Sequence, residues 1–355
     1  MTAHINRIGT AVPAHDVHRP FVAFARTLLA DDRTRAVFDR MAERSGISHR
    51  FSILQAGNLA AGEVDADGFY RRGAFPTTAA RMALYEPQAL ALALQAVAAL
   101  ELGSDTAGIT HLIVASCTGF TAPGLDLQLA DRLGLRSDVA RTMIGFMGCS
   151  AAVPALRAAR HIVLAEPAAR VLVVNLELCT LHLQETAEIE TVLSFLLFGD
   201  GAAAALVTAE PHGLALGDFR AMIVPDSQSL ITWKIGDQGF DMHLSGKVPG
   251  RIAQFLRDDF LRDQPIDTAT QDVQLWAVHA GGRTVLDAVE IGLRLRPELL
   301  RHSRAVLADY GNMSSATVMF VLARMLGESD RGARGLGMAF GPGMVAETFR
   351  FERAA

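Results

Sequence analysis

Lysine is almost absent from this sequence of 355 residues: only Lys234 and Lys247 are lysines, and all other basic residues among the 33 are arginines. We attribute this bias to genome composition. With 38 acidic residues the formal net charge is −5, so the chain has no basic surplus for binding nucleic acid. Cysteine is also scarce. Cys117, Cys149 and Cys179 are too few for a disulfide framework, which favours a reducing cytosol.

Long apolar runs are missing too. Every apolar stretch is too short or too interrupted to cross a bilayer, and the first residues lack the charged and apolar regions of a signal peptide. We therefore expect a cytoplasmic protein without a membrane span. Half of the residues are hydrophobic, which is enough to build a large core in one domain or in two fused halves.

Strands and helices alternate along the whole chain. We predict strands at residues 5–12, 109–116, 170–176, 201–208, 214–224, 273–278, 336–340 and 345–351, the last two forming a hairpin. We predict helices at 21–44, 77–99, 126–133, 186–195, 249–263, 284–293 and 315–326, and irregular structure at 52–75. The turn at Pro211-His212-Gly213 divides the chain into residues 1–210 and 211–355. The pattern predicts a layered α/β protein whose halves are a degenerate duplication.

A cysteine between small residues, Gly148-Cys149-Ser150, is the first candidate for chemistry. The residues behind it favour a helix, and Pro154 fits only in the first turn of that helix. Cys149 therefore lies at or just before a helix N-terminus, where backbone N–H groups and the helix dipole stabilise a thiolate. A small buried cysteine packed against glycines is the alternative.

Two further segments end in reactive side chains. A predicted strand delivers His279 to the turn Ala280-Gly281-Gly282, and Asn312 follows Gly311 just before a helix. Cys, His and Asn at three strand-to-loop junctions suit nucleophilic catalysis, because the His draws the proton from the thiol and the His and Asn donors hold a carbonyl oxygen. Taken singly, His279 could be an ordinary loop histidine and Asn312 a turn or N-cap residue.

Six segments in this order resemble one family. They are Cys117-Thr118-Gly119 through Pro123-Gly124, Gly148-Cys149, Leu197-Phe198-Gly199-Asp200-Gly201-Ala202, His279-Ala280-Gly281-Gly282, Tyr310-Gly311-Asn312-Met313-Ser314-Ser315 and Phe340-Gly341-Pro342-Gly343. The chain resembles the type III polyketide synthases, the chalcone synthase-like branch of the thiolase/ketosynthase superfamily. The resemblance implies a thiolase-like layered αβαβα fold with two pseudo-repeated halves, of which residues 1–210 carry the nucleophilic Cys and residues 211–355 the His and Asn. It also implies an acyltransferase that forms C–C bonds, and a homodimer.

The resemblance assigns the chemistry as follows. Cys149 would take an acyl group from a starter acyl-CoA, and His279 and Asn312 would bind the malonyl-CoA thioester and stabilise the enolate left by decarboxylation. His279 would also pair with Cys149 as imidazolium and thiolate. No cofactor is expected, because the CoA thioesters are substrates.

The pocket implied by the resemblance differs from that of the plant enzymes. Met242 replaces a second gatekeeping aromatic residue, Trp233 stands where plant enzymes carry a glycine, and Ala122 replaces a methionine that reaches the partner subunit. A flexible thioether at Met242 suits an aliphatic starter. The expected gatekeeper and pocket residues are Phe198, Met242, Trp233, Cys117, Thr118, Cys179, His182 and Ser314.

Binding of CoA is assigned to Arg44, with Arg50 nearby, and to Gly281 and Gly282, where backbone can approach the pantetheine arm. A solvated helix end is the alternative for Arg44. We expect no metal: Cys179, His182 and Glu185 could share a helical face, but no second pair of ligands accompanies them.

Three kinds of function remain open: the preferred synthase, other condensing enzymes, and a binding protein. We prefer iterative extension of a fatty acyl starter to alkylpyrones or alkylresorcinols. A phloroglucinol, chalcone or tetrahydroxynaphthalene-type synthase and an enzyme like β-ketoacyl-ACP synthase III are the enzymatic alternatives. A catalytically silent protein that sequesters acyl-CoA is the third, against which Cys149, His279 and Asn312 argue.

Overall fold

The computed structural model describes residues 1–260, 272–328 and 330–354. Within them nine strands form one mixed sheet, in the order β11-β12-β13-β8-β1-β7-β6-β4-β5. These strands are β1 (Ala3–Ala11), β4 (His111–Ser116), β5 (Ala140–Gly145), β6 (Val171–Leu178), β7 (Asp200–Thr208), β8 (Leu214–Ile223), β11 (Leu275–Val278), β12 (Arg334–Gly341) and β13 (Val345–Arg353). Two small two-stranded sheets are separate from it. One pairs β2 (His15–Asp16) with β3 (Phe51–Ser52), and the other is the hairpin of β9 (Ile231–Gly236) and β10 (Gly239–Leu244).

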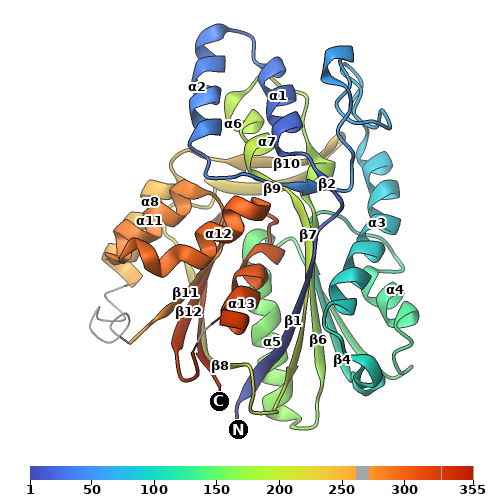
Figure 1. The fold of residues 1–355 in the computed structure, drawn as a ribbon, viewed down its shortest axis with the longest axis vertical. Coiled ribbons are helices and arrows are strands. Elements are labelled where there is room, and N and C mark those ends of the chain that lie inside the picture. The colour runs from blue at the N-terminus through green and yellow to red at the C-terminus, as the bar shows by residue number, and fades with distance from the viewer. Residues whose placement is uncertain (261–271, 329, 355) are drawn as a thin grey trace.

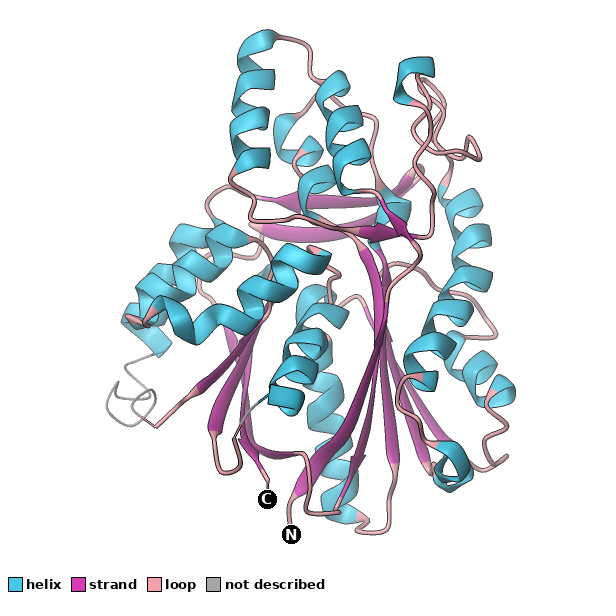
Figure 2. Cartoon of the chain, in the orientation of Figure 1, coloured by secondary structure: helices cyan, strands magenta, loops and turns pink. Residues whose placement is uncertain are grey.

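Helices cover both outer faces of this sheet and lie between its two halves (Figures 1 and 2). They are α1 (His18–Leu28), α2 (Asp32–Glu43), α3 (Thr78–Ala98), α4 (Leu125–Arg132), α5 (Ala152–Ala165), α6 (Ile189–Val192), α7 (Ser194–Leu197), α8 (Val248–Phe255), α11 (Arg283–Leu293), α12 (Arg301–Tyr310) and α13 (Ala316–Glu328). None of the helices in these residues is long and apolar enough to cross a membrane.

Five layers result, because the sheet folds on itself. Strand β1 pairs with β7 along most of its length but with β8 only at Ala3–Ile5, so the two halves of the sheet can splay apart. Helices α5 and α13 lie between the halves, α3 and α4 cover one outer face, and α8, α11 and α12 cover the other. The expected layered αβαβα fold is confirmed.

Alternating side chains in the buried strands hold the layers together. In β6, Val171 and Val173 pack into the central core around α5 and α13, whereas Leu172 and Val174 pack under α3. A strand covered on both faces is apolar on both sides, which is why Val171 to Val174 form a continuous apolar run.

The halves repeat one topology. In the first half β4 is parallel to β6, β6 is antiparallel to β7, and β7 is antiparallel to β1. In the second half β11 is parallel to β12, β12 is antiparallel to β13, and β13 is antiparallel to β8. Helix α5 precedes β6 as α13 precedes β12. The two central helices, which follow the Cys149 and Asn312 loops, are thus equivalent elements.

Most predicted strands and helices are confirmed to within a few residues, but the helices predicted at 21–44 and 186–195 are each divided in two. The helix predicted at 21–44 is divided into α1 and α2, because Asp31 caps a new helix by accepting from the Thr34 N–H. The segment 186–195 forms two one-turn helices, α6 and α7. Helix α8 ends at Phe255 and continues as a π-helix over Leu256–Phe260, and the rest of the helix predicted at 249–263 lies outside the described residues.

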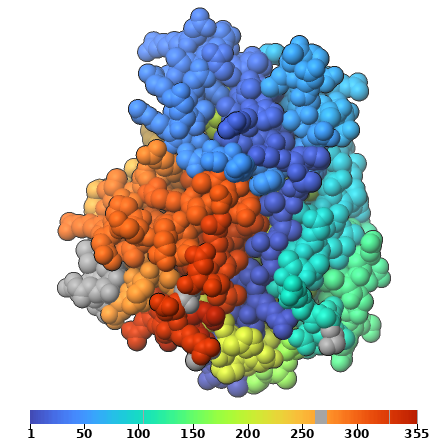
Figure 3. Space-filling model, in the orientation of Figure 1, coloured from blue at the N-terminus to red at the C-terminus, as the bar shows by residue number. Residues whose placement is uncertain are grey.

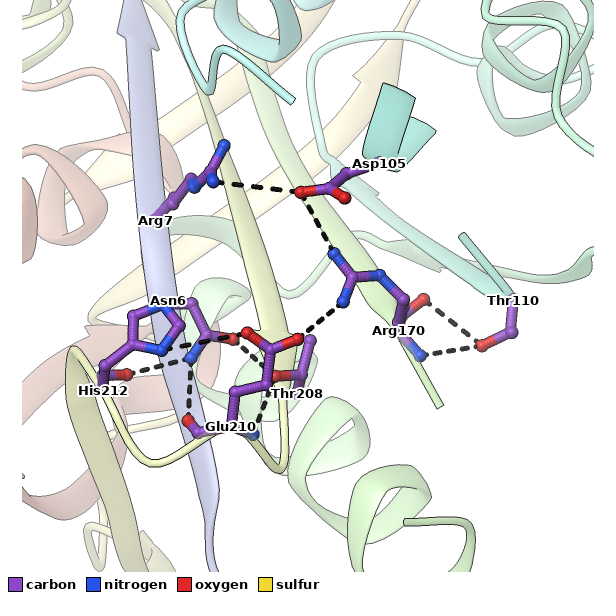
Figure 4. A network of polar contacts seen from close by, with 8 residues as sticks. All are labelled: Asn6, Arg7, Asp105, Thr110, Arg170, Thr208, Glu210 and His212. Atoms are coloured by element: carbon purple, nitrogen blue, oxygen red, sulfur yellow. Dashed lines mark hydrogen bonds and ion pairs between the residues drawn. The ribbon is translucent and has the colours of Figure 1, made fainter. Parts of the chain in front are cut away.

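A polar network lies at the end of the molecule where β1 and β4 begin (Figure 4). Arg170 forms ion pairs with Asp105 (3.5 Å) and Glu210 (2.8 Å), and Arg7 lies 3.8 Å from Asp105. The Asn6 amide donates to the backbone of Glu210 at 3.0 Å. These contacts join the start of β1 to the loops beside it and lie at the opposite end of β4 from the cavity described below.

Candidate active site

One cavity follows the carboxyl ends of β4, β6, β11 and β12, where α/β folds commonly bind ligands. The empty space that its walls enclose, together with the open space at its mouth, is about 920 Å³. It is lined by Cys117, Thr118, Gly148, Cys149, Cys179, His182, Leu183, Ser194, Phe198, Ile231, Trp233, Met242, Leu244, Val248, Ile252, His279, Gly281, Val285, Asn312, Ser314, Phe340 and Pro342. None of these side chains is a carboxylate, lysine or arginine.

Cys149 lies in a 3₁₀ turn, Gly148–Ser150, directly before α5, as predicted. Gly148 has φ +56°, and a Cβ there would lie 2.5 Å from Cδ of Pro342, so only glycine fits. The start of α5 does not ionise the thiol by itself. Burial raises the pKa of Cys149 to about 11, against the weaker influence of hydrogen bonds from Ser314 and Asn312.

Asn312 lies beside Cys149 with its amide already oriented. Its Nδ2 donates to the Gly281 carbonyl (3.2 Å), and its Oδ1 accepts from the Ser314 N–H (2.8 Å). The Cys149 Sγ lies 4.0 Å from both amide atoms. Because an amide nitrogen carries two hydrogens, one N–H of Asn312 remains for a molecule in the cavity.

His279 directly follows β11, and its backbone N–H donates to the Met338 carbonyl (2.8 Å). The side chain is 2% exposed, and within the described residues neither ring nitrogen has a hydrogen-bond partner. Burial lowers the pKa of His279 to about 3, so the imidazole is neutral at neutral pH. Buried polar groups in native proteins are almost always paired, and an unpaired donor and acceptor facing a cavity indicate a ligand.

The expected imidazolium–thiolate pair of His279 and Cys149 stays a prediction. Burial opposes each charge alone, in the directions given above. Direct transfer of the thiol proton to the imidazole would create both charges together, and their mutual attraction in a medium of low dielectric offsets part of the desolvation.

The hairpin β9–β10 forms one wall of the cavity. Trp233 and Met242 are directly opposite each other in it, and the Trp233 indole N–H donates to the Cys117 carbonyl (2.7 Å). His182 accepts the Phe240 N–H at Nδ1 (2.9 Å), so its proton is on Nε2, which donates to the Thr118 carbonyl (2.7 Å). All eight expected gatekeeper and pocket residues line the cavity.

Glu177 is a functional candidate that the sequence reasoning missed. This fully buried carboxyl on β6 accepts from the Cys117 N–H (3.0 Å), the Thr118 hydroxyl (2.9 Å) and the Ser315 hydroxyl (2.5 Å). Burial raises its pKa to about 7. A lone glutamate within the most apolar strand of the chain was the available signal.

Family models match almost the whole chain. The model for chalcone and stilbene synthases, N-terminal domain, matches residues 2–211, and the C-terminal-domain model matches residues 218–353. The chain belongs to the chalcone and stilbene synthase family.

Relatives define this type III polyketide synthase further. Type III polyketide synthase 21 of rice (Oryza sativa subsp. japonica) is 35% identical over 339 residues, which cover 90% of this chain and 85% of the relative. The structure of PKS-I from the brown alga Ectocarpus siliculosus superposes with a TM-score of 0.87 at 30% identity, over 99% of this chain and 98% of the other. The 1,3,6,8-tetrahydroxynaphthalene synthase of Streptomyces coelicolor A3(2) gives 0.86 at 28% identity, over 99% of each chain.

The residues assigned to CoA fall into two groups in the synthase. Gly281 lines the cavity, whereas Gly282 and Arg44 are outside its lining. Arg44 is exposed at the end of α2, and its carbonyl accepts from the Arg283 guanidinium (3.3 Å) at the start of α11. Arg44 therefore lies beside the turn that carries Gly281 and Gly282.

Arg50 does not lie at the surface with Arg44. It is fully buried and donates to the Phe198 carbonyl, so it cannot contact a phosphate at the surface. His182 and Glu185, two of the three residues considered as metal ligands, bind other groups. Both nitrogens of His182 are occupied by hydrogen bonds, and Glu185 accepts from the Gly73 N–H (2.8 Å).

Proposed function

We propose that this synthase holds an acyl group on Cys149 and extends it repeatedly by decarboxylative condensation with malonyl-CoA. One observation carries the proposal: an unpartnered imidazole on His279 and an amide N–H of Asn312 whose only further contact is the Cys149 sulfur at 4.0 Å line the same buried cavity. The arrangement suits a thioester carbonyl placed between those donors, within reach of an acyl group on the Cys149 Sγ.

The reaction needs only these side chains. The Cys149 sulfur attacks the thioester carbon of acyl-CoA, its proton passes to His279, and the leaving CoA thiolate takes that proton. Malonyl-CoA then binds with its thioester oxygen at the His279 and Asn312 N–H groups. Its carboxylate leaves as CO₂, and the electron pair moves to the enolate oxygen held by the donors. The enolate carbon attacks the acyl group, the C–S bond to Cys149 breaks, and the lengthened acyl-CoA can load again. Carbanion formation by decarboxylation requires no resident cofactor.

An aliphatic starter is our proposal for the substrate. Beyond Cys149 the wall is formed largely by Leu183, Ile231, Met242, Leu244 and further apolar side chains, and no charged group is present to bind a polar starter. Products would then be alkylpyrones or alkylresorcinols. The CoA phosphates lie outside the cavity in this proposal, and Arg44, beside Arg283, is an exposed cation on its Gly281 side.

A second copy of this chain is the proposed partner. Strand β5 is the last strand of the sheet, so one of its edges is unpaired in the described chain. Around it Phe120 (38%), Leu127 (43%), Met143 (36%) and Met147 (36%) are exposed, an unusual number of large apolar side chains for a free edge. Met143→Lys should convert a dimer to monomers in light scattering after size exclusion, and a wild-type monomer would contradict the proposal. Three free cysteines in one cavity suit a reducing cytoplasm.

Labelled malonyl-CoA tests the reaction. The wild-type enzyme with acyl-CoA starters of increasing length should release CO₂ and form labelled pyrones or resorcinols without a carrier protein. Cys149→Ala should abolish extension but keep decarboxylation of malonyl-CoA, because that step uses His279 and Asn312. Asn312→Leu should lose both. Failure of the wild type to release CO₂ with every starter would overturn the proposal.

A further inference from the structure

Arg50 is a charged side chain that the reaction proposed above does not use. It is 0% exposed, and it precedes β3 in a segment far from the cavity in sequence. Its guanidinium donates to the Phe198 carbonyl (2.6 Å), to the His18 Nδ1 (2.9 Å) and to the His18 carbonyl (3.5 Å). In the described part of the chain no carboxylate forms an ion pair with it. Its guanidinium bonds only to neutral groups, and the carboxylates of Asp16 and Asp200 act on it without direct contact, so the buried charge is costly to place.

The partners of Arg50 lie on the segment that carries Asn312. Residues Phe198 and Asn312 form a parallel bridge: the Asn312 N–H donates to the Leu197 carbonyl (2.8 Å), and the Gly199 N–H donates to the Asn312 carbonyl (3.0 Å). Arg50 therefore fixes, through the Phe198 carbonyl, the backbone on which Asn312 is aligned.

Its side-chain stem supports the same bridge from behind. A Cβ at Gly311 would lie 2.6 Å from the Arg50 Cγ, and one at Gly199 would lie 3.4 Å from the Arg50 Cβ. Gly311 also has φ +69°, a conformation that favours glycine. Because Gly199 and Gly311 have no side chains, the backbone of the bridge can pack directly against the Arg50 side chain.

We propose that Arg50 is a positioning residue for the decarboxylation step, which sets the Asn312 amide and the Phe198 ring through the backbone bridge between them. The inference rests on the proposed function of Asn312. It separates Arg50 from Arg44, an exposed arginine of the same type beside the CoA side of the cavity. A positioning role predicts a loss in kcat, whereas a phosphate ligand would change KM for CoA substrates alone.

Two substrates distinguish these roles. Decarboxylation is measured with malonyl-CoA and with the malonyl thioester of N-acetylcysteamine, which lacks the phosphates. Arg50→Lys keeps the charge but loses the planar fork, and we expect kcat to fall about ten- to a hundredfold with both substrates. KM should change by less than about twofold. The matched control Arg44→Met should raise KM for malonyl-CoA and leave the reaction of the short thioester unchanged.

Amide hydrogen exchange gives a readout independent of activity. Arg50→Lys should speed exchange at Gly199 and Asn312 while the rest of the chain keeps its protection. His18→Phe, which removes an acceptor of Arg50 but fills the space, should give a smaller effect of the same kind and replaces Arg50→Lys if that variant does not fold. Unchanged exchange with unchanged kcat, or a loss confined to malonyl-CoA, would overturn the inference. A wild type without decarboxylation would instead overturn the proposed function.

Discussion

Replacing His182 should alter the products of this synthase without altering its decarboxylation chemistry. The hairpin β9–β10 is not hydrogen-bonded into the main sheet, so its place depends on side chains such as His182, which joins Phe240 of β10 to Thr118 after β4. The ring also stacks on Phe240 with centroids 4.2 Å apart. His182→Phe keeps the stacked ring but leaves a buried N–H and a buried carbonyl unpaired.

The cost follows from those two groups. Each unsatisfied buried group costs about 1–3 kcal/mol, so His182→Phe should lower the free energy of unfolding by about 2–6 kcal/mol. For a chain of this length that corresponds to a fall in Tm of roughly 3–8 °C by the average entropy of unfolding per residue. His182→Asn can offer an oxygen to the Phe240 N–H, and His182→Gln can offer an N–H to the Thr118 carbonyl, so each should recover about half of the loss.

Function is measured by mass spectrometry of the products and by release of CO₂. A displaced hairpin moves Trp233 and Met242, so we expect more early-released short products from His182→Phe, with malonyl-CoA decarboxylation unchanged because Cys149, His279 and Asn312 keep their contacts. An unchanged product distribution together with an unchanged Tm would refute the role of His182. Loss of decarboxylation would show that His182 acts on the chemistry instead.

Three further predictions concern other groups of the site. Met242→Phe should narrow the range of acyl-CoA starters in a competition assay, and an unchanged range would remove the argument from its flexible thioether. His279→Gln should shift iodoacetamide alkylation of Cys149 to higher pH, because the imidazole can no longer take the thiol proton; identical profiles would exclude their pairing. Glu177 has a pKa raised from 4.5 to about 7, so the folded chain keeps a proton that the unfolded chain releases. Its contribution to stability is complete below pH 4.5 and lost as the pH rises through 7, which urea unfolding of wild type and Glu177→Gln between pH 5 and 8 should reveal.

Local sequence patterns predicted the features that depend on neighbouring residues, such as buried strands. The strand β6 opens with four apolar residues, Val171 to Val174, because both of its faces are covered, and that run is visible without a structure. A glycine precedes both Cys149 and Asn312. In the structure a side chain at either position would collide, with Pro342 at Gly148 and with the stem of Arg50 at Gly311. The family resemblance that these motifs carry, and not the local patterns, predicted the residues that line the cavity.

Long-range contacts explain what the sequence did not reveal. Arg50 looked like a surface cation because its partner Phe198 is 148 residues away in the chain. Glu177 is supported by Cys117, 60 residues away, and by Ser315, 138 residues away. The hairpin β9–β10 was missed although both of its strands alternate apolar and polar residues and Gly236 and Gly239 flank a two-residue turn, so here the local signal was available in the sequence.

The titratable side chains of the cavity share one property, which is burial away from water. Burial pushes Cys149, Glu177 and His279 towards their neutral forms, and the lining contains no charged residue. In the proposed reaction the malonyl carboxylate is therefore a charge without a partner inside the cavity. Loss of CO₂ transfers that charge to an enolate oxygen that two aligned N–H donors stabilise, and these donors are strongest where water is excluded. The same burial that keeps the resting thiol protonated thus favours the step that drives chain extension.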